Sequence, residues 1–227
     1  MVKDHRKPHS LLTVLSVTGL SSVLGWASAP CTRATSTAEY LIRSQTPFAP
    51  DGQIEMTPNS LTDRTKTTKT ERGIINGVAY RFFYSDGSGS FEGGRANGVS
   101  YDAVNPNWKT YCFVDPISDA KACKMSINNL GIVVSQDGRE NVLIGSDHFP
   151  GSEIVVRIDG ETPIRAAAKF GFGAGTAKRI IERLKTAKKV ATRYQEWPNS
   201  YVTDRIWELY GYRETLSYIR WAVKHIR

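Results

Sequence analysis

The fold of this chain is decided by residues 108–127, which read WKTYCFVDPISDAKACKMSI. Two runs with strand composition flank a turn around Asp115-Pro116. Pairing of these runs brings Cys112 and Cys123 together, and an oxidising compartment then closes a disulfide between them. Such a bond closes a short loop and stabilises the fold by about 2–3 kcal/mol. Two buried free thiols are the alternative interpretation.

Short apolar runs separated by turn residues continue on both sides of this segment. Upstream, residues 74–84 have strand composition and contain the hairpin-type pair Asn76-Gly77. Downstream, residues 132–134, 142–144 and 154–158 have strand composition. The turn residues between these runs are Asn128-Asn129, Asp137-Gly138, Phe149-Pro150-Gly151 and Asp159-Gly160. Turns at intervals of roughly eight to twelve residues predict an antiparallel sheet or sandwich.

The pattern changes to helical spacing after Gly173. Ile180, Ile181 and Leu184 fall on one face of an amphipathic helix of about 10–13 residues. Residues 190–194 then read as a strand. Two further helical stripes follow, one formed by Ile206, Leu209 and Tyr210 and one by residues 216–226, with Gly211 between them. We therefore expect a single α+β domain over residues 73–227, with an antiparallel, sandwich-like sheet, an amphipathic helix and additional C-terminal helices.

Residues 1–29 have the three parts of a secretory signal. Residues 1–10 are positively charged and residues 11–26 are apolar, and Ala27-Ser28-Ala29 supplies the small residues that a signal peptidase recognises. Cleavage after Ala29 places Pro30 at a disfavoured position, so cleavage after Ala27 is an alternative, and an uncleaved membrane anchor is another. The pattern predicts a periplasmic or extracellular protein.

Residues 30–72 separate this signal from the expected domain. Apolar residues are sparse there, and the polar tract over residues 62–70 buries too little surface to offset its ordering entropy. We expect a disordered Thr-rich linker over residues 30–72. Cys31 is removed with the signal, left unpaired or lipidated, although lipoprotein processing requires a Gly or Ala where Pro30 stands.

The chain is basic, with a formal net charge of +8 over 227 residues. Three basic residues and one acidic residue lie in the signal, so +6 of the +8 remains beyond it. A basic exported protein favours anionic partners such as lipid headgroups, lipopolysaccharide or a glycan, or an envelope protein. Because export separates the chain from nucleic acid, no nucleic-acid partner is expected.

The basic residues gather in one stretch, which we call the basic cluster. Its members are Lys178, Arg179, Arg183, Lys185, Lys188, Lys189 and Arg193. Such a cluster predicts a salt-sensitive surface for anionic glycan or lipid. The aromatic residues that follow it in the sequence are interpreted as core, with Trp207 and Trp221 between helices and sheet.

We identify no catalytic residue, no metal site and no cofactor site from the sequence. Beyond the signal only His148 and His225 remain, too few for a typical zinc site. His148 follows Ser146 and Asp147, but sequence neighbours rarely converge as a catalytic triad requires. We expect His148 to cap a turn or to contact the backbone at a strand end.

Four short segments together resemble the invasion-associated locus B type of bacterial periplasmic protein. They are Trp108-Lys109-Thr110-Tyr111-Cys112, Cys123-Lys124-Met125, Ile144-Gly145 and the helix Ile180-Ile181-Glu182-Arg183-Leu184-Lys185. The resemblance covers residues 98–195. This chain adds residues 199–226 and lacks the second cysteine pair that the family often carries. The resemblance implies a secreted, non-enzymatic β-sandwich-like domain linked to envelope function or host-cell entry.

These observations favour an exported, non-catalytic protein that binds another envelope component. The alternative is a secreted hydrolase acting on cell-wall or glycan material through Asp147 or Glu153 with Asp204. That alternative requires paired carboxylates about 5–10 Å apart across a cleft.

Overall fold

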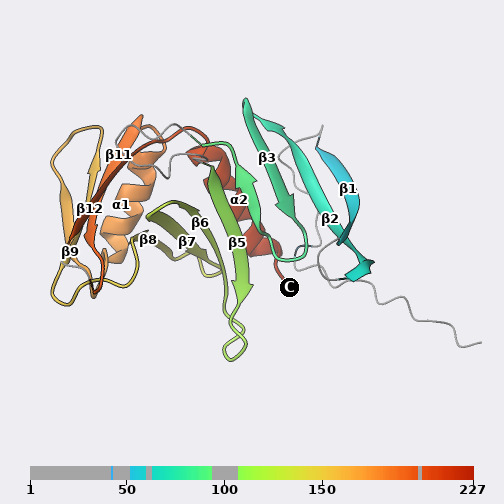
Figure 1. Cartoon of the computed structure of the whole chain (residues 1–227), viewed down its shortest axis with the longest axis horizontal. Coiled ribbons are helices and arrows are strands. Elements are labelled where there is room, and N and C mark those ends of the chain that lie inside the picture. Colours follow the sequence, from blue (N-terminus) through green and yellow to red (C-terminus); the bar gives the residue numbers. More distant parts are fainter. Residues whose placement is uncertain (1–41, 43–51, 60–62, 94–106, 199–200) are drawn as a thin grey trace, which may run out of the picture. The chain divides into compact units, whose positions relative to one another are not determined.

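The computed structural model describes residue 42 and residues 52–59, 63–93, 107–198 and 201–227. This part of the chain is built mostly from antiparallel strands in two sheets, with two helices (Figure 1). The predicted α+β class and sandwich-like antiparallel character are confirmed. The expected signal, residues 1–29, lies outside the described residues, as does Cys31.

The larger sheet has eight strands in sequence order, each antiparallel to the next. The strands are β1 (Gln53–Asn59), β2 (Asp63–Ile75), β3 (Val78–Phe83), β4 (Gly89–Phe91), β5 (Trp108–Val114), β6 (Lys121–Ile127), β7 (Leu130–Ser135) and β8 (Glu140–Ile144). Asn76 and Gly77 form the turn between β2 and β3, as predicted. Their φ angles of 50° and 83° lie in the left-handed region that a tight hairpin turn requires.

The smaller sheet has four antiparallel strands in the spatial order β10-β9-β11-β12. The strands are β9 (Glu153–Ile158), β10 (Ile164–Ala167), β11 (Lys189–Gln195) and β12 (Val202–Glu208). One side of this sheet joins the hydrophobic core through alternate residues such as Ile154, Val156 and Val190. The other side carries the residues that alternate with them.

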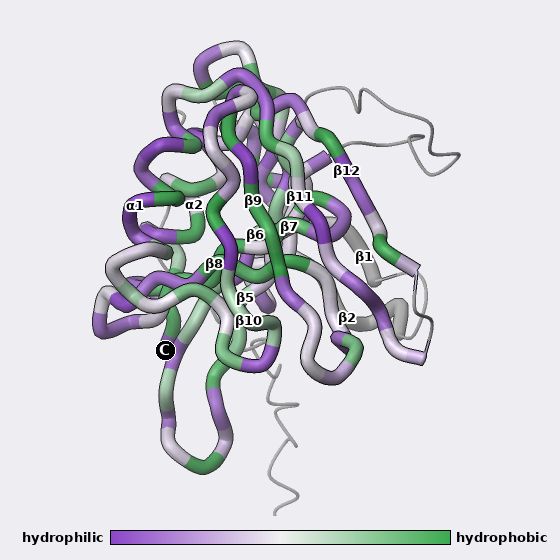
Figure 2. The backbone as a smooth tube through the Cα atoms, turned by 90° about the vertical axis from the view of Figure 1, so that its left-hand side faces the viewer, coloured by the Kyte–Doolittle hydropathy of each residue, from purple (hydrophilic) through white to green (hydrophobic). Residues whose placement is uncertain are grey.

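The two helices cover the inner faces of the sheets. Helix α2 (Tyr212–His225) lies against β5, β6 and β7, and α1 (Ala174–Leu184) lies between β8 and the smaller sheet (Figure 1). The turns of α1 alternate between hydrophilic and hydrophobic colours, which mark residue hydropathy (Figure 2). The apolar residues Ile180, Ile181 and Leu184 are buried, and the basic residues of the helix face outward. The predicted amphipathic helix is therefore confirmed.

Gly211 sets the start of α2. Its φ of 72° lies in the left-handed region, and a Cβ atom at this position would collide with the carbonyl oxygen of Glu92. Within α2, Glu214 lies in the first turn and Lys224 in the last turn. Negative charge then lies at the positive end of the helix dipole and positive charge at its negative end, which stabilises the helix.

Aromatic side chains fill the core between α2 and the larger sheet. Trp108 is fully buried, its Nε1 donates a hydrogen bond to the Tyr210 carbonyl at 3.0 Å, and its ring meets that of Tyr212 edge-on at 5.5 Å. Burial of one large apolar side chain contributes about 1.5–3 kcal/mol. Trp207 is buried in the core, as predicted, and Trp221 is partly buried against it.

Cys112 and Cys123 face each other across β5 and β6 and form a disulfide with an S–S distance of 2.03 Å. The predicted bond is therefore present. It joins β5 and β6, the two strands predicted from residues 108–127. Gly87 packs against the Cys112 side chain, so the bond is enclosed on the core side of the sheet.

The first of the two additional C-terminal helices is absent, because residues 202–208 form strand β12. The spacing of Ile206, Leu209 and Tyr210 is helical, but a short apolar spacing does not separate helix from strand. In the structure Ile206 points outward while Trp207 is buried, an alternation of period two. Pairing with β11 decides the outcome, since Arg193 and Asp204 face each other in register and form an ion pair.

The expected linker over residues 30–72 is also corrected. Strands β1 and the first part of β2 lie within it, so the ordered part of the chain begins earlier than residue 73. Residue Ile42 is buried and forms an antiparallel bridge with Ile226. Threonine-rich sequence has high strand propensity, and the tract pairs with β1, whereas β2 pairs with β3 only from Thr70 onward. The rest of the expected linker lies outside the described residues.

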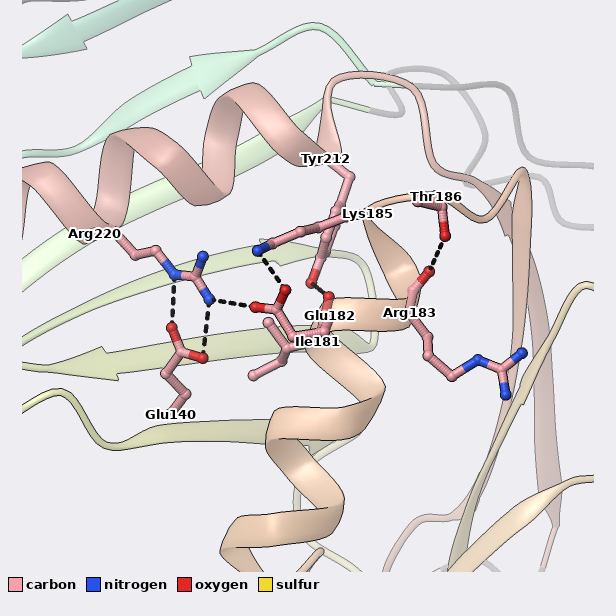
Figure 3. Close-up of polar contacts among 8 residues, drawn as sticks. All are labelled: Glu140, Ile181, Glu182, Arg183, Lys185, Thr186, Tyr212 and Arg220. Carbon is pink, nitrogen blue, oxygen red and sulfur yellow. Dashed lines mark hydrogen bonds and ion pairs between the residues drawn. The ribbon is translucent and has the colours of Figure 1, made fainter.

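A charged cluster joins α1, α2 and β8 (Figure 3), and we call it the helix clasp. Arg220 of α2 donates to both carboxylate oxygens of Glu140 at 2.7 and 3.0 Å, and also to Glu182 of α1 at 3.1 Å. Lys185 donates to Glu182 at 2.6 Å. Tyr212 donates to the Ile181 carbonyl at 3.2 Å. The clasp therefore holds both helices to the edge of the larger sheet.

Candidate functional site

The structure divides the basic cluster between two surfaces. Lys178, Arg179 and Arg183 lie on the exposed side of α1, and Lys185 follows its last turn. Lys188 precedes β11, Lys189 begins it, and Arg193 lies farther along the same strand. The predicted residues therefore lie on α1, in the segment that follows it and on β11.

Several of these cations are neutralised by neighbouring carboxylates. Arg183 pairs with Glu161, Lys185 with Glu182 and Arg193 with Asp204. Within the described ranges no ion pair is found for the side chains of Lys178, Arg179, Lys188 and Lys189. The backbone N–H groups of Lys188 and Lys189 both donate to the Asp159 carboxylate, which fixes the turn before β11.

Strand pairing in the smaller sheet assembles a different group of cations, which we call the arginine face. It consists of Arg157, Arg165 and Arg193 around Val155. Arg165 of β10 and Arg193 of β11 are the direct partners of Val155 on either side, and Arg157 follows Val155 by two residues on β9. These side chains therefore point to the same side of the sheet, one strand spacing of about 4.8 Å or one two-residue repeat of about 7 Å from Val155.

Val155 shows that arginine stems cover the centre of this face. It lies outside the hydrophobic core cluster, yet only 8% of its surface is exposed. Long arginine side chains bury their methylene groups on apolar surface while the guanidinium stays in water. A shallow depression of about 220 Å³ is lined here by Val155, Ala191 and the three arginines of the face. Arg205 and Asp204 also contribute to its rim.

The three guanidinium groups differ in how strongly they are held. Arg193 binds both oxygens of Asp204 at 2.6 Å, which lowers the pKa of Asp204 below its usual range and raises that of Arg193. Arg165 makes a single contact of 3.2 Å with Glu153, and both side chains are more than half exposed. An exposed pair of this kind contributes about 0–1 kcal/mol.

Among the described residues, Arg157 is bound only to backbone groups. Its Nε donates to the Glu161 carbonyl at 2.8 Å and its Nη2 to the Gly160 carbonyl at 2.6 Å. These contacts orient the guanidinium but leave its charge without a carboxylate. Arg157 and Arg165 are thus available to an incoming anion, and Arg193 is pre-positioned beside them by Asp204.

The chemistry of this arrangement is anion binding. Guanidinium groups present planar, paired donors that match the oxygens of phosphate or carboxylate groups. The sequence identified Arg193 but not Arg157 or Arg165, because the pairing of β10, β9 and β11 that unites them is not local. The available signal was the alternation of arginine with apolar residues in residues 153–158 and 164–167.

The residues proposed for hydrolysis lie on β9, on β12 and in the turn after β8. Glu153 contacts Arg165 and Asp204 contacts Arg193, so each carboxylate is bound to an arginine. In the strand register Asp204 lies in one row with Arg193 and Val155, and Glu153 lies two residues from Val155 along β9. Asp147 lies in the turn after β8.

Other carboxyl groups beside depressions have lowered pKa values. Backbone N–H groups of the turn that follows Asp115 donate to its carboxylate and lower its pKa, and the backbone N–H of Arg139 lowers that of Asp137. A general acid requires the opposite shift.

His148 contacts the backbone at a strand end, as predicted. Its Nε2 lies 2.7 Å from the Ile144 carbonyl oxygen, and its ring meets Tyr194 edge-on. Over the described ranges, no group of three or more His, Cys, Asp or Glu side chains gathers as metal ligands do. In the same part of the chain, no helix has the length and apolar character needed to cross a membrane.

Comparison with known protein families, with curated proteins and with solved structures finds no match for this chain. The site is therefore interpreted from its own geometry.

Proposed function

We propose that this chain is an exported, non-catalytic envelope protein whose arginine face binds phosphate groups of envelope lipids. The observation that carries the proposal is the placement of Arg157, Arg165 and Arg193 around the shallow depression at Val155. The signal-type pattern of residues 1–29 and the closed Cys112–Cys123 pair support an oxidising compartment. The phosphate belongs to a phospholipid headgroup or to lipopolysaccharide.

Binding proceeds by exchange of partners on an exposed surface. When a phosphate binds above Val155, Arg165 exchanges its contact with Glu153 for a contact with the phosphate, and Arg157 also contacts the phosphate. Arg193 keeps its contacts with Asp204. Because these groups are solvated, the attraction weakens as salt screens it over a length of about 10 Å at 0.1 M. We therefore expect moderate, salt-sensitive affinity.

A non-catalytic role is supported by the carboxylates. Glu153 and Asp204, two of the residues that a hydrolase would use, are held by arginines. The resemblance of residues 98–195 to invasion-associated locus B proteins supports the same proposal, with an envelope or host-entry role. Turnover of a generic ester, glycan or peptide substrate that is lost on substitution of Asp147 or His148 would contradict it.

The lipid proposal is tested by vesicle binding of the full chain. Vesicles of phosphatidylcholine containing phosphatidylglycerol are compared with lipopolysaccharide micelles, and phosphatidylcholine vesicles containing oleate provide the same net negative charge on carboxylates, with phosphate only in the zwitterionic headgroup. The double substitution Arg157→Ala and Arg165→Ala should lower affinity for the phosphate lipids about tenfold or more, since each charged contact contributes on the order of 1.5–3 kcal/mol.

The control is the double substitution Lys178→Ala and Arg179→Ala, which removes the same charge from the exposed side of α1. It should change affinity less than about threefold. The stronger of the two lipid arms identifies the source of the phosphate. Equal losses in both variants, or equal binding to oleate vesicles, would show general charge attraction and contradict the proposal.

A further inference from the structure

The larger sheet has a second unassigned surface on the side opposite α2. Along β5 the residues Trp108, Thr110 and Cys112 are buried, so Lys109, Tyr111 and Phe113 point outward. The strand register places Lys124, Val133 and Asn141 beside Tyr111 in one row across β6, β7 and β8. We call this side of β5–β8 the outer face.

Two depressions lie on the outer face, one on each side of the Tyr111 row. The first, of about 560 Å³, includes Phe113, Ala122 and Ser135. The second, of about 250 Å³, includes Lys124, Ser126 and Leu143. Both follow β6 and β7, and the run from Ala122 to Asn128 spans about 20 Å at 3.3 Å per residue. The surface is therefore long enough for several units of an extended polymer.

The middle of this surface is aromatic and apolar. Tyr111 is 45% exposed and Phe113 is 43% exposed, with ring centroids 6.0 Å apart, and Leu143 is exposed nearby. Exposed aromatic rings on a rigid sheet offer flat faces for the C–H faces of sugar rings, at a low entropic cost. Side chains fixed on neighbouring strands keep these rings in place without a ligand.

Two lysines flank the aromatic pair. Lys124 lies over the Tyr111 ring with its Nζ 5.9 Å from the centroid, and Lys109 donates to the Ser90 hydroxyl at 3.3 Å. Among the residues that the structure describes, neither lysine has a carboxylate partner. Positive charge beside an exposed aromatic ring is complementary to a sugar that carries a carboxylate.

The second depression ends in groups that suit sugar hydroxyls. Ser126, Asn128, Asn129 and Ser146 line it. The Asn129 side-chain oxygen accepts hydrogen bonds from Thr192 and Trp207. Its Nδ2 is buried and has no partner in the described part of the chain. Because this donor is enclosed, the groups of the second depression that face a ligand are Ser126, Asn128 and Ser146.

We infer that the outer face of β5–β8 binds a linear acidic polysaccharide, with Tyr111 and Phe113 stacking on sugar rings and Lys109 and Lys124 meeting their carboxylates. The backbone groups of β6 and β7 are already paired on both sides within the sheet. Recognition on this face therefore relies on side chains, not on addition of a strand. The inference does not rest on the arginine face.

The test is calorimetric binding of oligogalacturonides to the full chain, with the same oligosaccharides after reduction of their carboxyl groups as the neutral control. Acidic oligosaccharides should bind about tenfold more tightly than the reduced ones. Tyr111→Ala should weaken binding of both about tenfold, since ring stacking contributes on the order of 1–3 kcal/mol. Lys124→Gln should weaken only the acidic oligosaccharides.

Matched controls separate this site from others. Ile117→Ala removes a fully exposed side chain at the tip of the β5–β6 hairpin and should leave binding unchanged, as should the Arg157/Arg165 double variant. Tyr111 is exposed, so its variant should melt like the parent. Equal binding of reduced and acidic oligosaccharides would overturn the acidic assignment. Binding that Tyr111→Ala leaves intact, or no binding at all, would overturn the site.

Discussion

Glu71 is the most enclosed carboxyl group of the described chain, with 3% of its surface exposed. The hydroxyl groups of Tyr80 and Tyr84 donate to its two oxygens at 2.8 and 2.6 Å. Burial, followed by the neighbouring Glu71, raises the pKa of Tyr84 far above its ordinary value of 10.0, so Tyr84 stays a neutral donor. A polar group in this position is tolerated because it is hydrogen-bonded.

Removal of one of these donors should therefore destabilise the protein. We expect Tyr84→Phe to lower the free energy of unfolding by about 1–3 kcal/mol, measured by urea denaturation, because the buried Glu71 carboxylate loses one of its donors. Tyr210→Phe is the control, since Tyr210 is exposed and donates to the Gly77 carbonyl at 2.8 Å. Its cost should be clearly smaller. Equal costs would contradict the assigned role of Glu71.

Single residues also show where sequence reasoning was sufficient. Cys112 and Cys123 lie on either side of a turn signal, so a local hairpin brings them together, and the structure contains the bond. Arg157 and Arg165 could not be grouped with Arg193 in advance, because their proximity depends on two strand pairings that join distant segments. Contacts between neighbouring segments can be predicted from the sequence, whereas the register between distant strands is known only from the structure of the sheet.

At the scale of elements, the helix clasp is the contact that decides how the helices are held. Arg220 and Glu140 form a bidentate pair in which the Glu140 side chain is 12% exposed. We expect Arg220→Met to lower the free energy of unfolding by about 2–4 kcal/mol, because it leaves a sheltered carboxylate without its partner. Chemical denaturation measures the loss.

The Arg193→Met variant is a matched control for the clasp. It breaks a bidentate pair of similar geometry whose side chains are more than half exposed, and its cost should be about 1 kcal/mol or less.

Lys185, and then Arg220, lower the pKa of Glu182 below its ordinary 4.5. A lowered carboxyl pKa stabilises the fold above pH 4.5, and that stability is lost as the pH falls through the folded value. The acid loss should be smaller in Arg220→Met, and equal losses in both Met variants would contradict the clasp.

Elements also show why some predictions failed. Strands such as β6, β7 and β9 carry apolar runs with turn dipeptides at their ends, and they were predicted within a few residues. The sequence predicts a helix where β12 lies, because Ile206, Leu209 and Tyr210 have helical spacing. It predicts a linker where β1 and the first part of β2 lie, because their polar, Thr-rich sequence shows no apolar run. In both cases pairing with a neighbouring strand overrides the local pattern.

At the scale of the whole molecule, the two surfaces proposed here as binding sites would take ligands of related chemistry. The arginine face lies on the smaller sheet and the outer face lies on the larger one, and both present cations beside apolar side chains. Lipid phosphate and acidic polysaccharide both occur at a cell envelope. The two proposals therefore share one requirement, which is that the chain leaves the cytoplasm.

Intact-mass analysis of the protein purified from its native cells tests that requirement most directly. We expect a chain cleaved after Ala27 or Ala29, recovered from the envelope or the medium, with two hydrogens missing from the closed Cys112–Cys123 pair. An acyl mass at Cys31 would also place the chain in the envelope. A full-length chain in the cytoplasm, with both thiols open to alkylation, would contradict the account.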